Sequence, residues 1–347
     1  MTTEDSPEIK KVAVIGCGAI GASWAALFAG HGLQVSAFDI RPEAEAFMRD
    51  LVTSAVPTLS RLGQLKASPD SDDDDAAAVS AVLSRIAFTT DLATALHAAD
   101  FVQENGPERL PSKQALFASI TAHVRPAVII ATSSSGLTCS SIQSGAACSS
   151  PTAHNPSRFV VGHPFNPPHL IPLVEVVGGR QTSAQTVSRT ASFYRSLGKK
   201  AVVLDREVPG HVANRLQAAL VREVLHLTQS GVCSVADVDD AMAYGPGLRW
   251  GVMGPNALLH LGGGPGGIEH LSRHLLGPMT GWWAERDPVV DEGLRRKWVE
   301  GTMEAVGGRR YEDLTRQRDE GIVELLRTRA AWDGYAEGRK DGEGRGE

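Results

Sequence analysis

The sequence contains few cysteines, no long apolar run and no excess of basic residues, and each absence excludes a class of protein. Its four cysteines lack C-x-x-C spacing, so they indicate neither a zinc site nor a disulfide framework and fit a reducing, cytoplasmic setting. No apolar run approaches the roughly 18 residues that a membrane span requires. A net charge of −6 without a basic stripe argues against nucleic acid as a partner. The acidic start, MTTED, lacks the basic-then-apolar order of a signal peptide.

A glycine fingerprint follows the first apolar segment. Residues 11–15 (KVAVI) have the composition of a buried parallel strand and lead directly into 16–21 (GCGAIG), after which a helical stretch begins. In a G-x-G-x-x-G unit the first glycine permits a tight turn, the second admits a pyrophosphate, and the third lets helix and strand pack closely. The helix start adds free amides for the phosphates. The segment therefore predicts a dinucleotide-binding unit.

An acidic residue ends the second predicted strand, 35–39 (VSAFD). Asp39 lies 18 residues after Gly21, where an acid hydrogen-bonds the adenosine ribose. An acid at this position repels a 2′-phosphate, so we expect NAD rather than NADP. Arg41 leaves the question of NADP tolerance open, because a guanidinium is able to pair with that phosphate.

Strand-like and helical runs alternate over residues 1–207, which predicts a Rossmann-type, doubly wound α/β domain. Beyond it, residues 213–230 carry apolar side chains at helical spacing and end at Gly231, and Ser234 forms a capping box with Asp237. We therefore expect a mostly α-helical second domain over 208–330, with the substrate between the domains. The further predicted strands are 86–89, 101–103, 128–131, 159–161, 173–177 and 201–204, and further helices are expected around 294–305 and 311–329.

Three polar stretches are assigned no function, and the insertion among them, which lies between Ser135 and His163, is the one able to reshape the substrate mouth. They are an acidic loop over 67–77, a Ser- and Ala-rich insertion over 143–156, and a tail over 331–347.

A histidine and a glutamate stand twelve positions apart in the segment from 162 to 176 (GHPFNPPHLIPLVEV), on two predicted strands joined by a proline-rich turn. An imidazole accepts a proton near neutral pH, and a carboxylate on its far ring nitrogen fixes its tautomer. His163 and Glu175 therefore form a candidate base pair for removing a proton from an alcohol while hydride leaves the same carbon.

These motifs resemble those of the 3-hydroxyacyl-CoA dehydrogenase superfamily over nearly the whole chain. The match comprises the glycine fingerprint, the E-x-x-x-x-K from Glu108 to Lys113, 133–135 (SSS), 163–167 (HPFNP) and 214–216 (NRL), all in order. The resemblance implies an NAD-dependent dehydrogenase that needs no metal and forms a homodimer through its C-terminal helical domain.

The resemblance also implies residue roles. His163 would act as the base, Glu175 would stabilise its protonated form, and Ser135 and Asn214 would bond the reacting oxygen. Ser133 and Ser134 adjoin Ser135, so a one-residue slip changes that assignment, and Asn214 is alternatively a helix N-cap, since Asn favours that position. The expected cofactor-binding residues are Gly16, Gly18, Ala19, Ile20, Gly21, Asp39, Glu108, Lys113 and Asn166, of which Glu108 and Lys113 are alternatively an exposed ion pair.

Within the superfamily, Trp24, 107–110 (PERL) and 245–250 (GPGLRW) resemble the branch of carnitine dehydrogenase and lambda-crystallin, an L-gulonate 3-dehydrogenase. Carnitine carries a carboxylate that Arg249 suits and a quaternary ammonium that Trp250 suits, although Trp250 is equally suited to packing between helices. The aspartate run between residues 50 and 86 weighs against a CoA tail, whose phosphates favour basic residues.

We therefore expect oxidation of the 3-hydroxyl of a small, carnitine-like L-3-hydroxy acid. An L-3-hydroxyacyl-CoA is the second candidate substrate and L-gulonate the third. A crystallin-like structural protein that binds NAD without turnover is the alternative from another class. The pair Trp282–Trp283 and the glycine-rich 262–267 indicate a remodelled pocket or dimer face.

Overall fold

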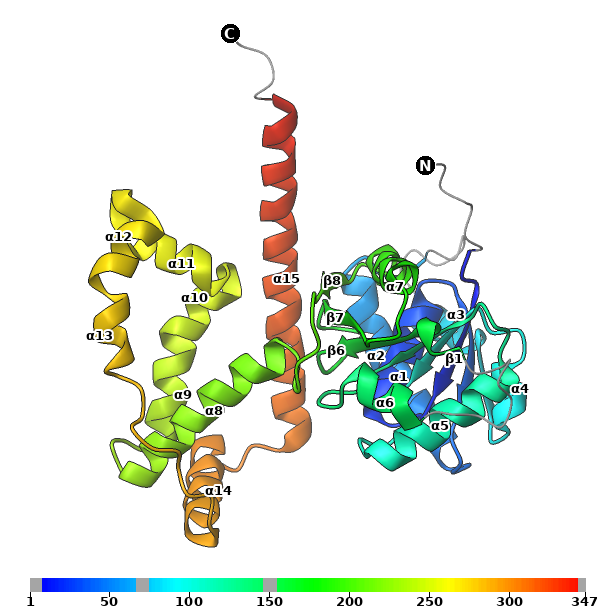
Figure 1. Cartoon of the computed structure of the whole chain (residues 1–347), viewed down its shortest axis with the longest axis horizontal. Helices are drawn as coiled ribbons and strands as arrows, with labels where there is room; N and C mark the ends of the chain where they lie inside the picture. The colour runs from blue at the N-terminus through cyan, green and yellow to red at the C-terminus, as the bar shows by residue number, and fades with distance from the viewer. Residues whose placement is uncertain (1–7, 67–74, 146–154, 343–347) are drawn as a thin grey trace. The chain divides into compact units, whose positions relative to one another are not determined.

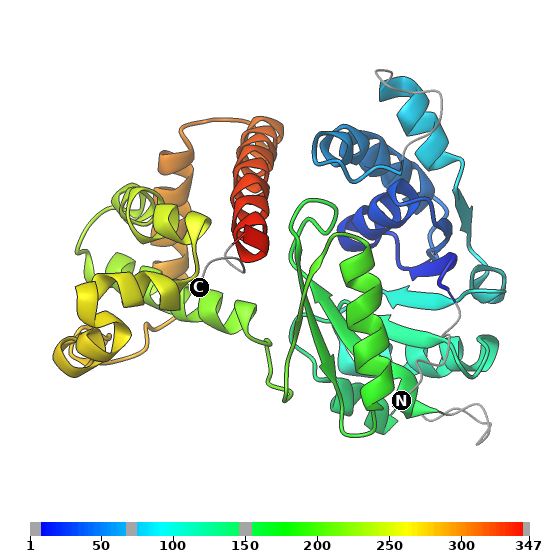
Figure 2. The ribbon, with the colours of Figure 1, turned by 90° about the horizontal axis from the view of Figure 1, so that it is seen from above.

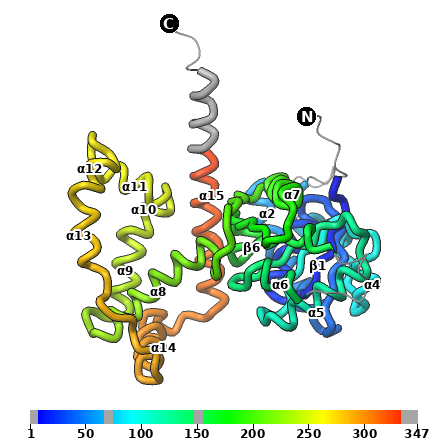
Figure 3. Tube along the Cα trace, viewed as in Figure 1, coloured from blue at the N-terminus to red at the C-terminus, as the bar shows by residue number. Residues whose placement is uncertain are grey.

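The computed structural model describes residues 8–66, 75–145 and 155–342, with side chains described up to residue 331. The chain divides into two compact units, one ending at Asn214 and the other starting at Arg215. The division falls inside helix α8 (Ala213–Ser230), through which the trace in Figure 3 passes from one unit to the other. The boundary expected near residue 208 lies just before this helix.

The first unit is built on a mostly parallel sheet, part of which is labelled in Figure 1. Its eight strands follow the order β3-β2-β1-β4-β5-β6-β7-β8. The strand order reverses between β1 and β4, so this part of the sheet has the topology of a doubly wound nucleotide-binding fold. β6 and β7 pair antiparallel, whereas the other neighbours pair parallel. The strands are β1 (Lys11–Ile15), β2 (Gln34–Phe38), β3 (Ile86–Thr89), β4 (Phe101–Glu104), β5 (Ile129–Thr132), β6 (Phe159–Pro164), β7 (Leu173–Gly178) and β8 (Lys200–Val203).

Helices cover both faces of this sheet. Successive strand residues point to opposite faces, so Val12 and Val14 belong to one apolar cluster, whereas Ala13 and Ile15 belong to another. The first cluster packs under α1, α2 and α7, and the second under α4, α5 and α6. α7, green in Figure 2, lies against β6, β7 and β8. The helices are α1 (Ala19–Gly30), α2 (Ala44–Arg61), α3 (Asp75–Leu83), α4 (Leu92–Leu96), α5 (Leu110–His123), α6 (Cys139–Gly145), the 3₁₀ helix η1 (Pro156–Arg158) and α7 (Ala184–Ser196).

The second unit is helical, as predicted. Gly231 follows α8 with a φ of 67°, the left-handed conformation that ends helices, and the capping box of Ser234 and Asp237 opens α9. Few of its described side chains are buried. Its helices after α8 are α9 (Val235–Tyr244), α10 (Pro246–Val252), α11 (Pro255–Gly262), the 3₁₀ helix η2 (Gly264–Gly266), α12 (Gly267–His274), α13 (Leu276–Thr280), α14 (Glu292–Val306) and α15 (Tyr311–Gly342). Among the described helices of the chain, none has the length and apolar character needed to cross a bilayer.

The three polar stretches overlap helices where they are described. Asp75 starts α3, Gln143 is buried within α6, and α15 continues into the expected tail as far as Gly342. Gln143 donates to the carbonyl of Pro156 and to the hydroxyl of Thr182, so its amide joins the two ends of the expected insertion to each other and to the segment before α7. The remaining parts of the loop and the insertion, residues 67–74 and 146–154, lie outside the described residues.

Candidate active site

The turn between β1 and α1 has the shape that a dinucleotide requires. Gly16 has a φ of 91°, and a Cβ on Gly21 would lie 1.8 Å from the carbonyl oxygen of Gly16. Gly18 faces open space and is the N-cap of α1, and among the described residues no side-chain cap bonds the start of this helix. Since only a hydrogen occupies each of these Cβ positions, a pyrophosphate can approach the amides of the first helical turn. These residues fit the phosphates of NAD.

Asp39 lies beside this turn at the end of β2. Its carboxylate accepts hydrogen bonds from the amide of Cys17 at 3.0 Å and from the guanidinium of Arg41 at 3.1 Å. Burial alone would raise the pKa of Asp39, but the bonds from Arg41 and Cys17 outweigh it and lower that pKa. Arg41 is thus paired with Asp39, so a 2′-phosphate would have to compete with a carboxylate for its guanidinium.

The serines after β5 have three different environments. Ser133 Oγ accepts from Trp24 Nε1 at 3.1 Å and from Gln103 Nε2 at 2.9 Å, and donates to Asn105 Oδ1 at 2.7 Å. Ser134 Oγ donates to Glu108 Oε1 at 2.7 Å. Ser135 is exposed, and its hydroxyl makes no hydrogen bond to the described part of the chain. Of the three hydroxyls, only that of Ser135 is therefore available to a ligand.

Lys113 is buried rather than exposed. Its ammonium donates to both carboxylate oxygens of Glu104 and to the carbonyl of Gly106, each at 2.9 Å, and lies 3.8 Å from Glu108. These three bonds use its three hydrogens and fix the loop after β4. Glu104 was missed as a partner in the sequence, although a carboxylate at the end of a strand was the available signal.

Glu108 is half-exposed and organises the loop after β5. Its Oε1 accepts from the amides of Ser135 and Gly136, at 3.0 and 2.9 Å, in addition to Ser134 Oγ. Burial raises its pKa, but these bonds and the nearby Lys113 charge outweigh burial and lower it. The exposed-pair alternative for Glu108 and Lys113 is therefore wrong for the lysine, whereas contact of either residue with the cofactor remains a prediction.

His163 and Glu175 face each other across the β6–β7 ladder, where they are register partners. His163 Nδ1 lies 2.9 Å from Glu175 Oε2, and both side chains are buried. Because a carboxylate only accepts, Nδ1 carries the proton and Nε2 carries the lone pair. Within the described chain no hydrogen-bond partner occupies Nε2, so the pair leaves one basic nitrogen free.

The second oxygen of Glu175 is held by the backbone that enters α8. Oε1 accepts from the amides of Val212 and Ala213, at 2.8 and 3.0 Å. Burial would raise the pKa of Glu175, but the bonds from His163 and these two amides lower it. Glu175 is therefore a carboxylate at neutral pH and can offset a positive charge on His163.

Two predicted site asparagines, Asn214 and Asn166, follow α8 residue Ala213 and strand β6 in the chain. Asn214 is the second residue of α8 and donates its side-chain amide to the carbonyl of Ser135 at 3.1 Å, so the N-cap alternative is wrong. Asn166 is exposed in the turn after β6, before the cis peptide to Pro167. The structure thus brings Ser135, His163, Glu175 and Asn214 together, with the roles of all four still predictions.

One residue in this cluster was missed in the sequence. His211 is buried, its ring centroid lies 5.1 Å from that of His163, and its Nε2 lies 3.0 Å from the carbonyl oxygen of Ser134. No motif marks it, because its position depends on a turn at residues 208–211 whose conformation the sequence does not specify.

The two predicted substrate residues lie in the second unit, on α10. Arg249 and Trp250 are both exposed, with 43% of Trp250 accessible, so Trp250 is not a buried core residue. Their role toward a substrate remains a prediction.

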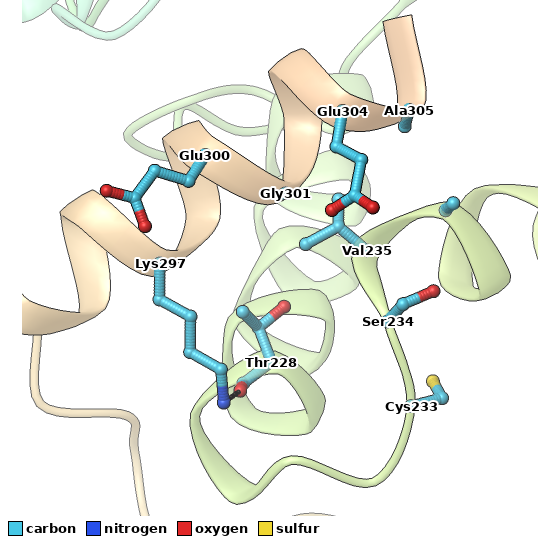
Figure 4. A pocket seen from close by; sticks show the side chains of 10 residues that line it. Thr228, Cys233, Ser234, Val235, Lys297, Glu300, Gly301, Glu304 and Ala305 are labelled. Atoms are coloured by element: carbon cyan, nitrogen blue, oxygen red, sulfur yellow. Dashed lines mark hydrogen bonds between the residues drawn. The ribbon is translucent and has the colours of Figure 1, made fainter. Parts of the chain in front are cut away.

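A pocket of about 340 Å³ lies in the second unit between the α8–α9 turn and α14 (Figure 4). Lys297 reaches across it to the carbonyl oxygen of Thr228, near the end of α8, and Ser234 at its rim caps α9. Cations at helix C-termini and hydroxyls at N-termini stabilise helix ends. These polar groups therefore hold helices together.

Comparisons with known proteins give the family of the chain. Residues 11–208 match the family model "3-hydroxyacyl-CoA dehydrogenase, NAD binding domain", and residues 210–301 match the model of the C-terminal domain of that family. An L-carnitine dehydrogenase of Streptomyces coelicolor is 45% identical over 93% of this chain and 96% of its own. A 3-hydroxyacyl-CoA dehydrogenase of Gibberella moniliformis is 40% identical over 92% of this chain and 94% of its own.

A solved structure extends the similarity to three dimensions. The NAD+-dependent dismutase 5-formyl-3-hydroxy-2-methylpyridine 4-carboxylic acid 5-dehydrogenase superposes with a TM-score of 0.77 at 30% identity, covering 94% of this chain and 99% of its own. The chain belongs to the 3-hydroxyacyl-CoA dehydrogenase family and is an NAD-dependent oxidoreductase that acts on CH–OH groups.

Proposed function

We propose that the chain oxidises the 3-hydroxyl of a small, carnitine-like L-3-hydroxy acid to the 3-oxo compound, with His163 as the base. The observation that carries the proposal is the buried contact of 2.9 Å between His163 Nδ1 and Glu175 Oε2. It leaves His163 Nε2 as the nitrogen that accepts the hydroxyl proton.

Residues of the chain accept the proton of the substrate hydroxyl and release it. As the hydroxyl loses its proton to His163 Nε2, the imidazole becomes an imidazolium and Glu175 offsets the charge. NAD+, when bound, supplies the acceptor for the hydride that leaves the same carbon. His163 then returns the proton to solvent, so the products are the ketone, NADH and one proton.

Ser135 and Asn214 are proposed to orient the hydroxyl. Of the three serine hydroxyls after β5, that of Ser135 has no hydrogen-bond partner among the described residues. The side-chain amide of Asn214 donates to the carbonyl oxygen of Ser135 at 3.1 Å, which places the two side chains near each other. Holding the oxygen of the substrate in one place aligns its carbon for hydride transfer, which contributes orders of magnitude to the rate.

Relatives named L-carnitine dehydrogenase support a carnitine-like substrate. Carnitine combines a carboxylate with a quaternary ammonium, and the proposed partners are Arg249 for the former and Trp250 for the latter. A 3-hydroxyacyl-CoA is the second candidate, because the relative from Gibberella moniliformis carries that name.

NADH formation with L-carnitine and with L-3-hydroxybutyryl-CoA, measured side by side, tests the substrate class. We expect a clear preference for L-carnitine. A preference for the CoA ester would replace the first candidate by the second. Binding of NADH without turnover of either compound would contradict both and favour a sugar acid such as L-gulonate or a non-catalytic role.

We also propose that the chain forms a homodimer through its helical unit. Large apolar side chains are exposed on its helices and loops, including Trp282 at 65%, Trp283 at 68% and Met303 at 60%. Apolar and aromatic groups in such numbers are typical of surfaces that a partner covers.

A further inference from the structure

His211 is a second histidine against the candidate base, and the proposed mechanism does not use it. Its side chain is 1% exposed, and its ring contacts that of His163 at a centroid distance of 5.1 Å and an angle of 42°. It stands at the end of the turn between β8 and α8, directly before the residues whose amides hold Glu175.

The hydrogen bond of His211 fixes its tautomer. A backbone carbonyl only accepts, so the 3.0 Å contact with the carbonyl of Ser134 places the proton of the neutral ring on Nε2. Nδ1 then carries a lone pair, and it is buried without a hydrogen-bond partner among the described residues. Burial also lowers the pKa of His211, which keeps the ring neutral at neutral pH.

The backbone of His211 has an uncommon conformation. Its φ is +52°, and Ala98 is the one other described non-glycine residue with a positive φ. Left-handed backbone in a side chain-bearing residue persists when its surroundings stabilise it. Here that conformation follows Gly210, also at positive φ, and turns the next two amides onto Glu175 Oε1.

Residues 211–214 therefore link the two halves of the proposed site. His211 bonds the carbonyl of Ser134, Val212 and Ala213 bond Glu175, and Asn214 bonds the carbonyl of Ser135. We infer that His211 is a positioning residue for the proposed reaction: its neutral imidazole packs on His163 and ties the base pair to the strand end that carries Ser135. The inference rests on the proposed role of His163.

Three substitutions at His211 distinguish the effect of the imidazole ring from the effect of the left-handed backbone turn. His211→Gly accepts the positive φ but removes the ring. His211→Phe fills the space without a polar atom, and His211→Gln restores a donor under the same backbone constraint as Phe. Each variant is assayed for kcat, KM, the pH profile of kcat/KM and NADH affinity, with the substrate that the wild-type protein oxidises.

We expect His211→Gly and His211→Phe to lower kcat by about 10- to 100-fold with NADH affinity unchanged, because a small displacement of reacting groups has an effect of this size. His211→Gln should recover part of the loss. The groups around His211 are His163, Glu175 and Glu108. A phenyl ring makes the surroundings of the proposed base less polar, so the pH profile of kcat/KM of His211→Phe should differ from that of the wild-type protein.

A His163→Gln control separates a failure of the proposed function from a failure of the inference about His211. If His163→Gln retains normal turnover, the proposed function itself fails. If His163→Gln is inactive while His211→Gly and His211→Phe keep wild-type kcat and pH profile, only the inference about His211 is overturned. Should His211→Phe fail to fold, His211→Gly and His211→Gln decide by the same kcat and pH criteria.

Discussion

Glu175 joins two structures through its two oxygens: Oε2 contacts His163 Nδ1 at 2.9 Å, and Oε1 accepts the amides of Val212 and Ala213. The carboxylate thus sets both the tautomer of the proposed base and the start of α8. The orientation of His163 therefore depends, through Glu175, on the backbone that enters α8.

Replacing Glu175 with Gln should lower kcat by roughly 10²- to 10⁴-fold, since an amide can donate to Nδ1 and favour the tautomer whose Nε2 is already protonated. Steady-state oxidation rates, with NADH binding by fluorescence as the control, measure this. A variant with normal NADH binding and more than half of the wild-type kcat would contradict the role assigned to Glu175.

The two serines Ser133 and Ser135 should respond differently to alanine. Ser135→Ala should lower kcat by about 10-fold or more with little change in thermal unfolding, because its hydroxyl has no hydrogen-bond partner among the described residues. Ser133→Ala is the matched control. It should lower the unfolding free energy by about 1–3 kcal/mol, since it removes the partner of Trp24 Nε1 and Gln103 Nε2. If Ser133→Ala lost activity and Ser135→Ala lost stability, Ser133 rather than Ser135 would be the serine that contacts the substrate.

Asp39 should determine the preference for NAD over NADP. In Asp39→Asn the carboxylate that is predicted to bind ribose hydroxyls and to repel a 2′-phosphate is lost, and Arg41 loses its ionic partner. We expect the ratio of kcat/KM for NAD to that for NADP to fall by about 10-fold or more. Arg41→Ala should retain the wild-type preference for NAD, and a switch toward NADP in Arg41→Ala would refute this account.

Lys199 should make stability depend on pH in the alkaline range. Its ammonium is buried against the carbonyls of Pro168 and Ile171 and the ring of Trp24, and burial lowers its pKa to about 7 from 10.5. Between these two values the unfolded chain binds a proton that the folded chain does not, so the contribution of Lys199 to stability rises with pH. Below about 7 both states are protonated and the cost of the buried charge is present in full.

Denaturant unfolding of the wild-type protein and of Lys199→Met from pH 7 to 10 tests this prediction. The variant should lose part of the upward slope, whatever its stability at pH 7. An unchanged slope would show that Lys199 keeps its proton in the fold throughout this range.

The proposed homodimer is tested by the mass of the protein in solution. Sedimentation at micromolar concentration should give about twice the 36.8 kDa of one chain. A single species of one chain's mass would refute the proposal, and a dimer interface would no longer explain the exposure of Trp282 and Trp283.

Local patterns predicted the elements of this fold better than their arrangement. The run 86–89 is strand β3 to the residue, and the capping box at Ser234 opens a helix, because each depends on neighbours in sequence. The antiparallel register that sets His163 opposite Glu175 was anticipated only as two strands joined by a turn. The contact of Lys113 with Glu104 and the place of His211 depend on burial and on a left-handed turn, which residue spacing does not encode.

NADH formation from NAD+ and L-carnitine by the wild-type protein and by His163→Gln, with NADH binding measured on both, tests whether His163 is the base. We expect turnover by the wild-type protein, a loss of roughly 10²-fold or more in the variant, and equal NADH affinity. Near-normal turnover by His163→Gln would contradict it.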